Sequence, residues 1–261
     1  MGQATLPTLV HAIGGDKVTG FFLVLARVSP LFVLAPLFSS KMLPAKVKTV
    51  VAVGLAIGLT PIAVRGQQIP TDPLAVTGLI VEQVLVGLAF AFAVGAVLSA
   101  VEAAGSLTDM LAGFSFGSVV DPINGNQGGA LTNIYSMMGM AMFIAIGGDA
   151  WVLRGLARTF DLVPLTKSAP IASLTSGVVQ AFGSIFVAAV EVAAPVLLAM
   201  MVTDVAFGMV SKVVPQLNVF GVGFALKVGV AMLVVAASLP FISGFMSTQI
   251  SSAVLGALHT I

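Results

Sequence analysis

Residues 113–117 read Gly-Phe-Ser-Phe-Gly and match the G-x-S-x-G pattern that surrounds the nucleophilic serine of many hydrolases. In that chemistry Ser115 would attack an acyl carbon while a histidine accepts its proton. The pattern requires a strand before the serine, and no alternating strand pattern precedes this one. The only histidine downstream is His259, close to the end of the chain. Hydrolase chemistry is therefore disfavoured, and we expect no catalytic residues.

Five charged side chains lie within otherwise apolar stretches, where charge is costly unless it faces a cavity or a partner. They are Arg27, Glu82, Glu191, Asp204 and Lys227. Two alternatives stay open for them, a proton or ion path as in a small-solute transporter, and structural ion pairs. The chain has no cysteine and no carboxylate pair near a histidine, so we expect no metal site and no cofactor.

The composition is typical of a membrane protein. Of 261 residues, 58% are hydrophobic and 8% are charged, against about 25% charged in soluble domains. A soluble enzyme could not cover its surface with so few polar groups. Eleven Lys and Arg against ten Asp and Glu also leave no basic surface for nucleic acid.

Six long apolar stretches predict helices, because none alternates with period two and all exceed ordinary strand lengths. They lie at 18–38, 49–64, 78–101, 130–153, 178–210 and 217–245. Pro30 and Pro36 in the first stretch and Pro195 in the fifth predict kinks. The expected fold is all-α, a membrane-associated bundle of about six long, kinked hydrophobic helices that ends in a helical hairpin.

The membrane orientation and the true number of crossings stay open. If all six stretches crossed, Lys and Arg would be divided almost evenly between the two sides, so the positive-inside rule selects neither orientation. The first 16 residues lack a basic region and an early apolar core, so we expect no cleaved signal peptide.

The segment 105–122 is too rich in glycine for a stable helix and too apolar for an exposed linker. Residues 124–129 then predict a turn. Irregular backbone at membrane depth must lie within protein or along a water-lined cavity. We therefore expect a buried loop rich in Gly and Phe, either in a pore or packed as a re-entrant loop.

Small residues recur at every fourth position from the third stretch to just beyond its end, and they form a small-residue face on one side of a helix. They are Gly87, Ala91, Gly95, Ser99 and Ala103. This face could pack against another helix of the same chain or against a partner subunit, and both alternatives stay open.

Methionines cluster on the helix expected after the loop, at Met137, Met138, Met140 and Met142. Because methionine is flexible and polarizable, it can close around surfaces of varied shape. The cluster is a candidate gasket, and ordinary apolar packing is the alternative.

Four strings in the same order resemble the FliR family of bacterial type III export gates and its injectisome counterparts, over about 200 residues. The first contains Arg27, Pro36, Pro44 and Lys48. The second contains Gly113-Phe114-Ser115-Phe116 and Asp121-Pro122. The third contains Gly147, Trp151, Phe160 and Pro164. The fourth contains Pro215, Gln216, Asn218, Phe220, Gly223, Phe224 and Leu226. The chain departs from the family at Ala225, where proline is common.

The resemblance implies a non-enzymatic subunit of the flagellar export gate in the basal body, in the bacterial inner membrane, and an injectisome counterpart of the same gate stays open as the alternative. It implies FliP-like and FliQ-like partners, further FlhB-like and FlhA-like components, unfolded export substrates, contact with lipid and no nucleic acid. Residues 1–175 would resemble FliP and include a plug loop at 105–129, and residues 176–261 would resemble a FliQ hairpin. The plug residues carried over from the family are Gly113, Phe114, Ser115, Phe116, Gly117, Asp121 and Pro122.

Overall fold

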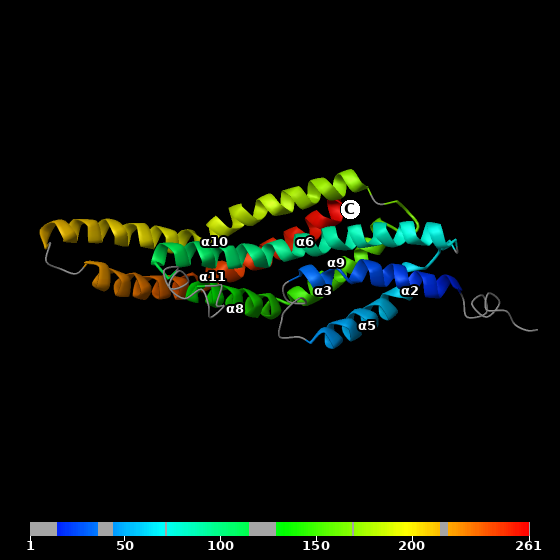
Figure 1. Ribbon diagram of the computed structural model, residues 1–261, viewed down its shortest axis with the longest axis horizontal. Helices are drawn as coiled ribbons and strands as arrows, with labels where there is room; N and C mark the ends of the chain where they lie inside the picture. The colour runs from blue at the N-terminus through cyan, green and yellow to red at the C-terminus, as the bar shows by residue number, and fades with distance from the viewer. Residues whose placement is uncertain are drawn as a thin grey trace, which may run out of the picture. The chain divides into compact units, whose positions relative to one another are not determined.

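The computed structural model describes residues 15–35, 44–70, 72–114, 129–168, 170–214 and 219–260. Within these ranges every regular element is a helix, which confirms the all-α prediction (Figure 1). The helices are α2 (Gly15–Val28), α3 (Leu31–Leu34), α5 (Ala45–Ala63), α6 (Pro73–Ala112), α8 (Ala130–Ala145), α9 (Gly148–Leu162), α10 (Ile171–Val213) and α11 (Val219–Thr260).

Several of these helices are long and apolar enough to cross a membrane. Among the described residues five candidate spans occur, at Lys17–Leu34, Ala45–Ala63, Pro73–Ala112, Ile171–Val213 and Gly221–His259. A sixth results if α8 and α9, which follow one another across a short break, count as one span. The prediction of about six long hydrophobic helices is therefore confirmed.

Two helix boundaries differ from the sequence expectation. Residues 105–112, expected in the loop, continue α6 as far as Ala112. The stretch 130–153, expected as one helix, is interrupted between α8 and α9, where Gly147 has φ +70°. That left-handed backbone is readily adopted by glycine and stops the α8 helix.

Of the described prolines, one separates two helices and others lie inside helices. The predicted kink at Pro30 is a break, because Pro30 lies between α2 and α3. Pro195 lies inside α10, and Pro61 and Pro240 lie inside α5 and α11. Pro36 lies outside the described residues.

The chain divides into two compact units, and the division passes through α6, α10 and α11. Unit 1 comprises Met1–Gly95, Asp149–Ala181 and Ser251–Ile261, and unit 2 comprises Ala96–Gly148 and Phe182–Ile250. In unit 1, α2 packs along α5, and the start of α10 contributes Leu174 to a buried cluster with Val86 and Val163.

Gly87 brings α6 very close to α2 in unit 1. A Cβ atom at this position would overlap the carbonyl oxygen of Arg27. Ala91, the next residue of the small-residue face, is also fully buried. At Gly87 the small-residue face therefore packs against another helix of the same chain. Packing of Ser99 against a partner subunit stays a prediction.

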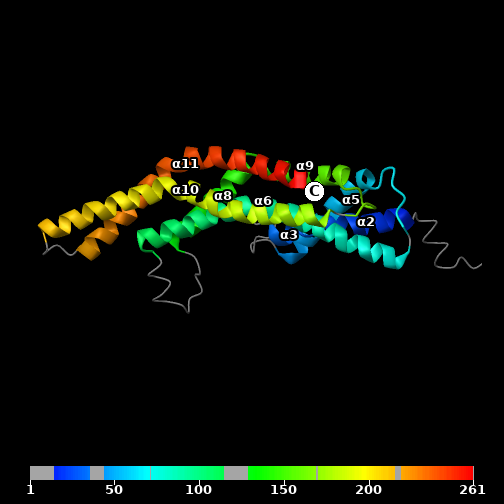
Figure 2. The same cartoon turned by 90° about the horizontal axis from the view of Figure 1, so that it is seen from above.

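In unit 2 the last part of α6 packs against α8. A Cβ atom at Gly105 would lie 2.8 Å from the Cα atom of Thr132, and Gly139 of α8 lies against Val101. Residues 105–112 contain only one glycine, Gly105, and there the close approach of α8 outweighs the low helix propensity of glycine. The remainder of unit 2 is the part of the α10–α11 hairpin between Phe182 and Ile250 (Figures 1 and 2).

Replacing Gly87→Ala should destabilise the protein by about 1–3 kcal/mol, because the methyl group would overlap the backbone of α2. Gly78→Ala on the same helix is the matched control, because a methyl group added there would have nothing within 4 Å. The control should gain about 0.5–1 kcal/mol from better helix propensity. Thermal unfolding of both variants in detergent measures the difference. Equal midpoints for the two variants would contradict this packing.

Candidate functional site

Asp109 joins the end of α6 to the start of α8 in unit 2. Its carboxylate accepts hydrogen bonds from the backbone N–H of Leu131 at 2.9 Å and of Thr132 at 2.7 Å, and from the Thr132 hydroxyl. The first N–H groups of a helix have no partner inside the helix and carry partial positive charge. Asp109, only 3% exposed, therefore caps α8 from a position 22 residues earlier in the chain.

The main chain of Asp109 ends α6 at the same point. Its carbonyl oxygen accepts hydrogen bonds from the N–H groups of Gly113 at 3.1 Å and Phe114 at 3.0 Å. Gly113 has φ +87°, the left-handed conformation in which a glycine commonly follows a helix. One residue thus fixes the chain where it leaves α6 and, through its side chain, where it enters α8.

Gly129, the residue before α8, is required by this arrangement. A Cβ atom there would overlap the carboxylate of Asp109. Any larger residue would push the carboxylate away from the N–H groups that it caps. Asp109 therefore binds the chain on both sides of the central loop, at Gly113 and Phe114 through its carbonyl oxygen and at Leu131 and Thr132 through its carboxylate.

The first aromatic residue of the loop packs on the C-terminal hairpin. The Phe114 ring meets the Phe224 ring of α11 edge to face, with centroids 5.9 Å apart. The Phe224 ring also lies against Gly113, where an added Cβ atom would be 3.4 Å from its nearest carbon. The edge-to-face contact contributes roughly 0.5–1.5 kcal/mol beyond the area that it buries.

Arg27 has the same role in unit 1 with the opposite charge. Its side chain is fully buried, and Nη1 donates to the carbonyl oxygen of Thr159 at 2.8 Å. Nη2 donates to the carbonyl oxygen of Val163, also at 2.8 Å. These carbonyls lie at the end of α9, where the helix dipole is negative, so Arg27 caps α9.

The remaining contacts of the guanidinium come from α6 and α9. Nε donates to Gln83 Oε1 at 2.6 Å, and the Gln83 amide in turn donates to the carbonyl oxygen of Leu165 at 3.2 Å. The guanidinium carbon lies 4.4 Å from the centre of the Phe160 ring. Arg27 thus ties α2, α6 and α9 together through neutral acceptors.

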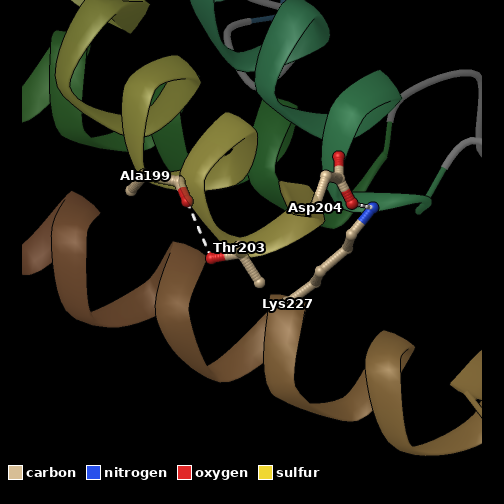
Figure 3. A network of polar contacts seen from close by, with 4 residues as sticks. All are labelled: Ala199, Thr203, Asp204 and Lys227. Atoms are coloured by element: carbon tan, nitrogen blue, oxygen red, sulfur yellow. Dashed lines mark hydrogen bonds and ion pairs between the residues drawn. The ribbon is translucent and has the colours of Figure 1, made fainter. Parts of the chain in front are cut away.

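Asp204 of α10 and Lys227 of α11 form an ion pair in unit 2 (Figure 3). Beside Asp204 on α10, the Thr203 hydroxyl donates to the carbonyl oxygen of Ala199 at 2.7 Å. For this pair of charges, the structure shows the structural alternative that the sequence left open. Glu82 is half-buried, and its Oε2 has no hydrogen-bond partner among the described residues.

The other predicted residues are distributed as follows. Met137 is 75% exposed, and Met138, Met140 and Met142 are half-buried. Pro44 immediately precedes α5, and Lys48 lies in its first turn. The structure does not describe Ser115, Phe116, Gly117, Asp121, Pro122, Pro215, Gln216 and Asn218, so these predictions lie outside the described residues.

The local structure does not fit a nucleophile elbow. The residues before Gly113 form the end of α6, where that motif needs a strand. Among the residues that the structure describes, no group of three or more His, Asp or Glu side chains could hold a metal ion.

The strings that carry the family resemblance meet in pairs. Arg27 of the first string packs on Phe160 of the third in unit 1. Phe114 of the second packs on Phe224 of the fourth in unit 2. The sequence alone does not identify Asp109 as a capping residue. A lone carboxylate in an apolar segment was its only sign, and its partners follow more than 20 residues later.

Candidate spans, apolar exposed helices and charges buried at helix ends together define a multi-pass helical membrane protein. The family described as Bacterial export proteins, family 1, matches residues 18–253, and this chain belongs to it. The match confirms the resemblance found in the sequence.

Three relatives illustrate the similarity. The flagellar biosynthetic protein FliR of Escherichia coli (strain K12) is 27% identical, over 86% of this chain and 86% of the relative. FliR of Bacillus subtilis (strain 168) is 29% identical, over 87% and 89%. The surface presentation of antigens protein SpaR of Salmonella typhimurium is 24% identical, over 86% and 83%.

Replacing Arg27→Lys should lower stability by about 3 kcal/mol, because a lysine cannot reach the Thr159 and Val163 carbonyls while bonding Gln83. Arg65→Lys is the matched control, because Arg65 is exposed. Thermal unfolding of the purified protein in detergent compares the two. If both variants unfold at the wild-type temperature, the guanidinium does not hold α9.

Replacing Asp109→Ala should cost about 2–4 kcal/mol, since it removes charge-assisted bonds to the Leu131 and Thr132 N–H groups. Backbone hydrogen exchange should show the loss first in the opening turn of α8. Glu102→Ala, at an exposed carboxylate of the same helix, controls for loss of charge. Unchanged exchange in α8 with Asp109→Ala would rule out the cap.

Proposed function

We propose that this chain is a core subunit of the flagellar type III export gate, where it forms part of a plugged channel for unfolded flagellar proteins. Family membership and similarity to FliR and SpaR proteins support the broader statement that it is a component of a type III export apparatus. The higher identities to the FliR proteins quoted favour a flagellar system.

The observation that carries the plug assignment is the double role of Asp109. A plug must be anchored at both ends, so that displacing it does not unravel the helices that carry it. Asp109 supplies this anchor before the loop, at Gly113 and Phe114, and after it, at Leu131 and Thr132. The segment between them contains the proposed plug residues Ser115, Phe116, Gly117, Asp121 and Pro122, with Gly113 and Phe114 at its start.

The helix lengths support assembly with partner subunits. Helices α6, α10 and α11 have 40, 43 and 42 residues. At about 1.5 Å per residue each is roughly 60 Å long, twice the ~30 Å of a hydrocarbon core. Ordinary tilts of up to about 40° do not remove the excess. Lipid therefore cannot cover the full length of their apolar surface, and other subunits would cover the rest.

The partners proposed are FliP-like and FliQ-like subunits, with FlhB-like and FlhA-like components nearby, in the bacterial inner membrane. The α10–α11 hairpin supports a FliQ-like part at 176–261, and the preceding helices support a FliP-like part at 1–175. The exposed Met137 is available for a gasket with Met138, Met140 and Met142. The chain would act without catalysis, and motive force would come from its partners and the proton gradient.

Deleting residues 114–119 should make membranes that contain the assembled complex permeable to ions and small solutes, because the deletion removes the proposed plug. Ser115→Ala is the matched control and should leave permeability low and flagellar export intact. Conductance of reconstituted complexes, together with export in cells, measures both effects. Unchanged conductance in an assembled deletion complex would rule out the plug, and loss of export with Ser115→Ala would instead indicate serine chemistry.

A further inference from the structure

Helix α10 has two unlike faces between residues 187 and 213. One face is buried within the chain and contains Val192, Val196 and Met200, all at 0% exposure. The opposite face is exposed and lies along one line of the helix at spacings of three, four and seven residues. Its members are Val187, Glu191, Leu198, Val202, Val205 and Met209.

The exposed face is apolar except for one carboxylate. Val187, Leu198, Val202, Val205 and Met209 each expose more than 60% of their surface. The Glu191 side chain is also exposed, and its carboxylate makes no hydrogen bond or ion pair with any described residue. This differs from Asp204, the other carboxylate of the helix, which pairs with Lys227 of the same chain.

Lipid is a poor partner for this face. Glu191 lies near the middle of a 43-residue helix, and a carboxylate in contact with acyl chains is unfavourable. Water is equally poor, because the neighbouring valine, leucine and methionine side chains would remain hydrated. A protein helix that is apolar along one side and carries a single cation satisfies both requirements.

We propose that the exposed face of α10 between Val187 and Met209 binds a helix of another export-apparatus subunit, and that a Lys or Arg of that helix pairs with Glu191. The spacing of the exposed residues is that of a helix–helix seam, in which knobs repeat every three and four positions. A single charged residue within such a seam fixes the register of the two helices, because any shift leaves the charge unpaired. Glu191 therefore selects the axial position of the partner. The proposal rests on the proposed function only in taking the partner to be an export subunit.

A photoreactive phenylalanine analogue at Leu198 tests the contact in the full chain, co-expressed with the other subunits in native membranes. Irradiation should link Leu198 to a partner chain about tenfold more than the same probe at Val196, which is buried within this chain two residues away. Adducts of Leu198 with lipid alone, or with no molecule, would overturn the proposal.

The pairing of Glu191 is tested by further substitutions in the chain that carries the photoreactive residue at position 198. Glu191→Lys should reduce the adduct about tenfold because like charges would then face each other, whereas Glu191→Asp should retain most of it. Glu102→Lys, at an exposed carboxylate of α6, is the control for added positive charge and should leave the adduct unchanged. An undiminished adduct with Glu191→Lys would overturn the pairing. Restoration of the adduct by an acidic substitution at one Lys or Arg of the partner would identify the cation.

This experiment fails independently of the gate assignment. Crosslinking reports a helix contact, and conductance after deletion of 114–119 reports a plug. A partner adduct at Leu198, together with unchanged conductance of the deletion complex, would support the proposed interface and contradict the plug assignment. Adducts with lipid alone, together with increased conductance of the deletion complex, would contradict the proposed interface and support the plug assignment.

Discussion

Satisfying helix ends without water is the constraint on which this structure depends. Each helix leaves N–H groups at its start and carbonyls at its end, and these groups need partners where water is scarce. Asp109 supplies a negative partner at the start of α8, and Arg27 supplies a positive one at the end of α9. Both signs match the helix dipole. The close packing at Gly87 and Gly129 follows, because it brings the capping residues within reach.

The many apolar side chains of this protein lie partly in its interior and partly on exposed helix faces. In α10 one side is buried by this chain, while the other exposes valine, leucine and methionine around a lone glutamate. The two carboxylates of this helix differ in their partners, since Asp204 is paired within the hairpin and Glu191 with no described residue. Helices longer than a bilayer then require protein neighbours for part of their apolar surface.

Helix positions were largely predictable from the sequence because long apolar stretches have few alternatives. Residues 105–112 were wrongly predicted as loop, since glycine lowers helix propensity but also permits the approach of Thr132 to Gly105. The break at Gly147 was missed because one glycine in an apolar stretch does not reveal its φ. Asp109 and Gln83 were not recognised as anchors, since their partners lie 22 and 82 residues away. The Arg27–Phe160 and Phe114–Phe224 contacts likewise join distant strings.

The remote capping of α9 has a consequence for biosynthesis. Arg27 lies in the first candidate span, but the carbonyl oxygens that accept its hydrogen bonds belong to residues made 132 and 136 positions later. Until Thr159 and Val163 emerge from the ribosome, the guanidinium has no partner there and is costly to leave in lipid. The first helix can therefore reach its final packed position only after the middle of the chain has been synthesised. A chain truncated before α9 cannot form these hydrogen bonds of Arg27.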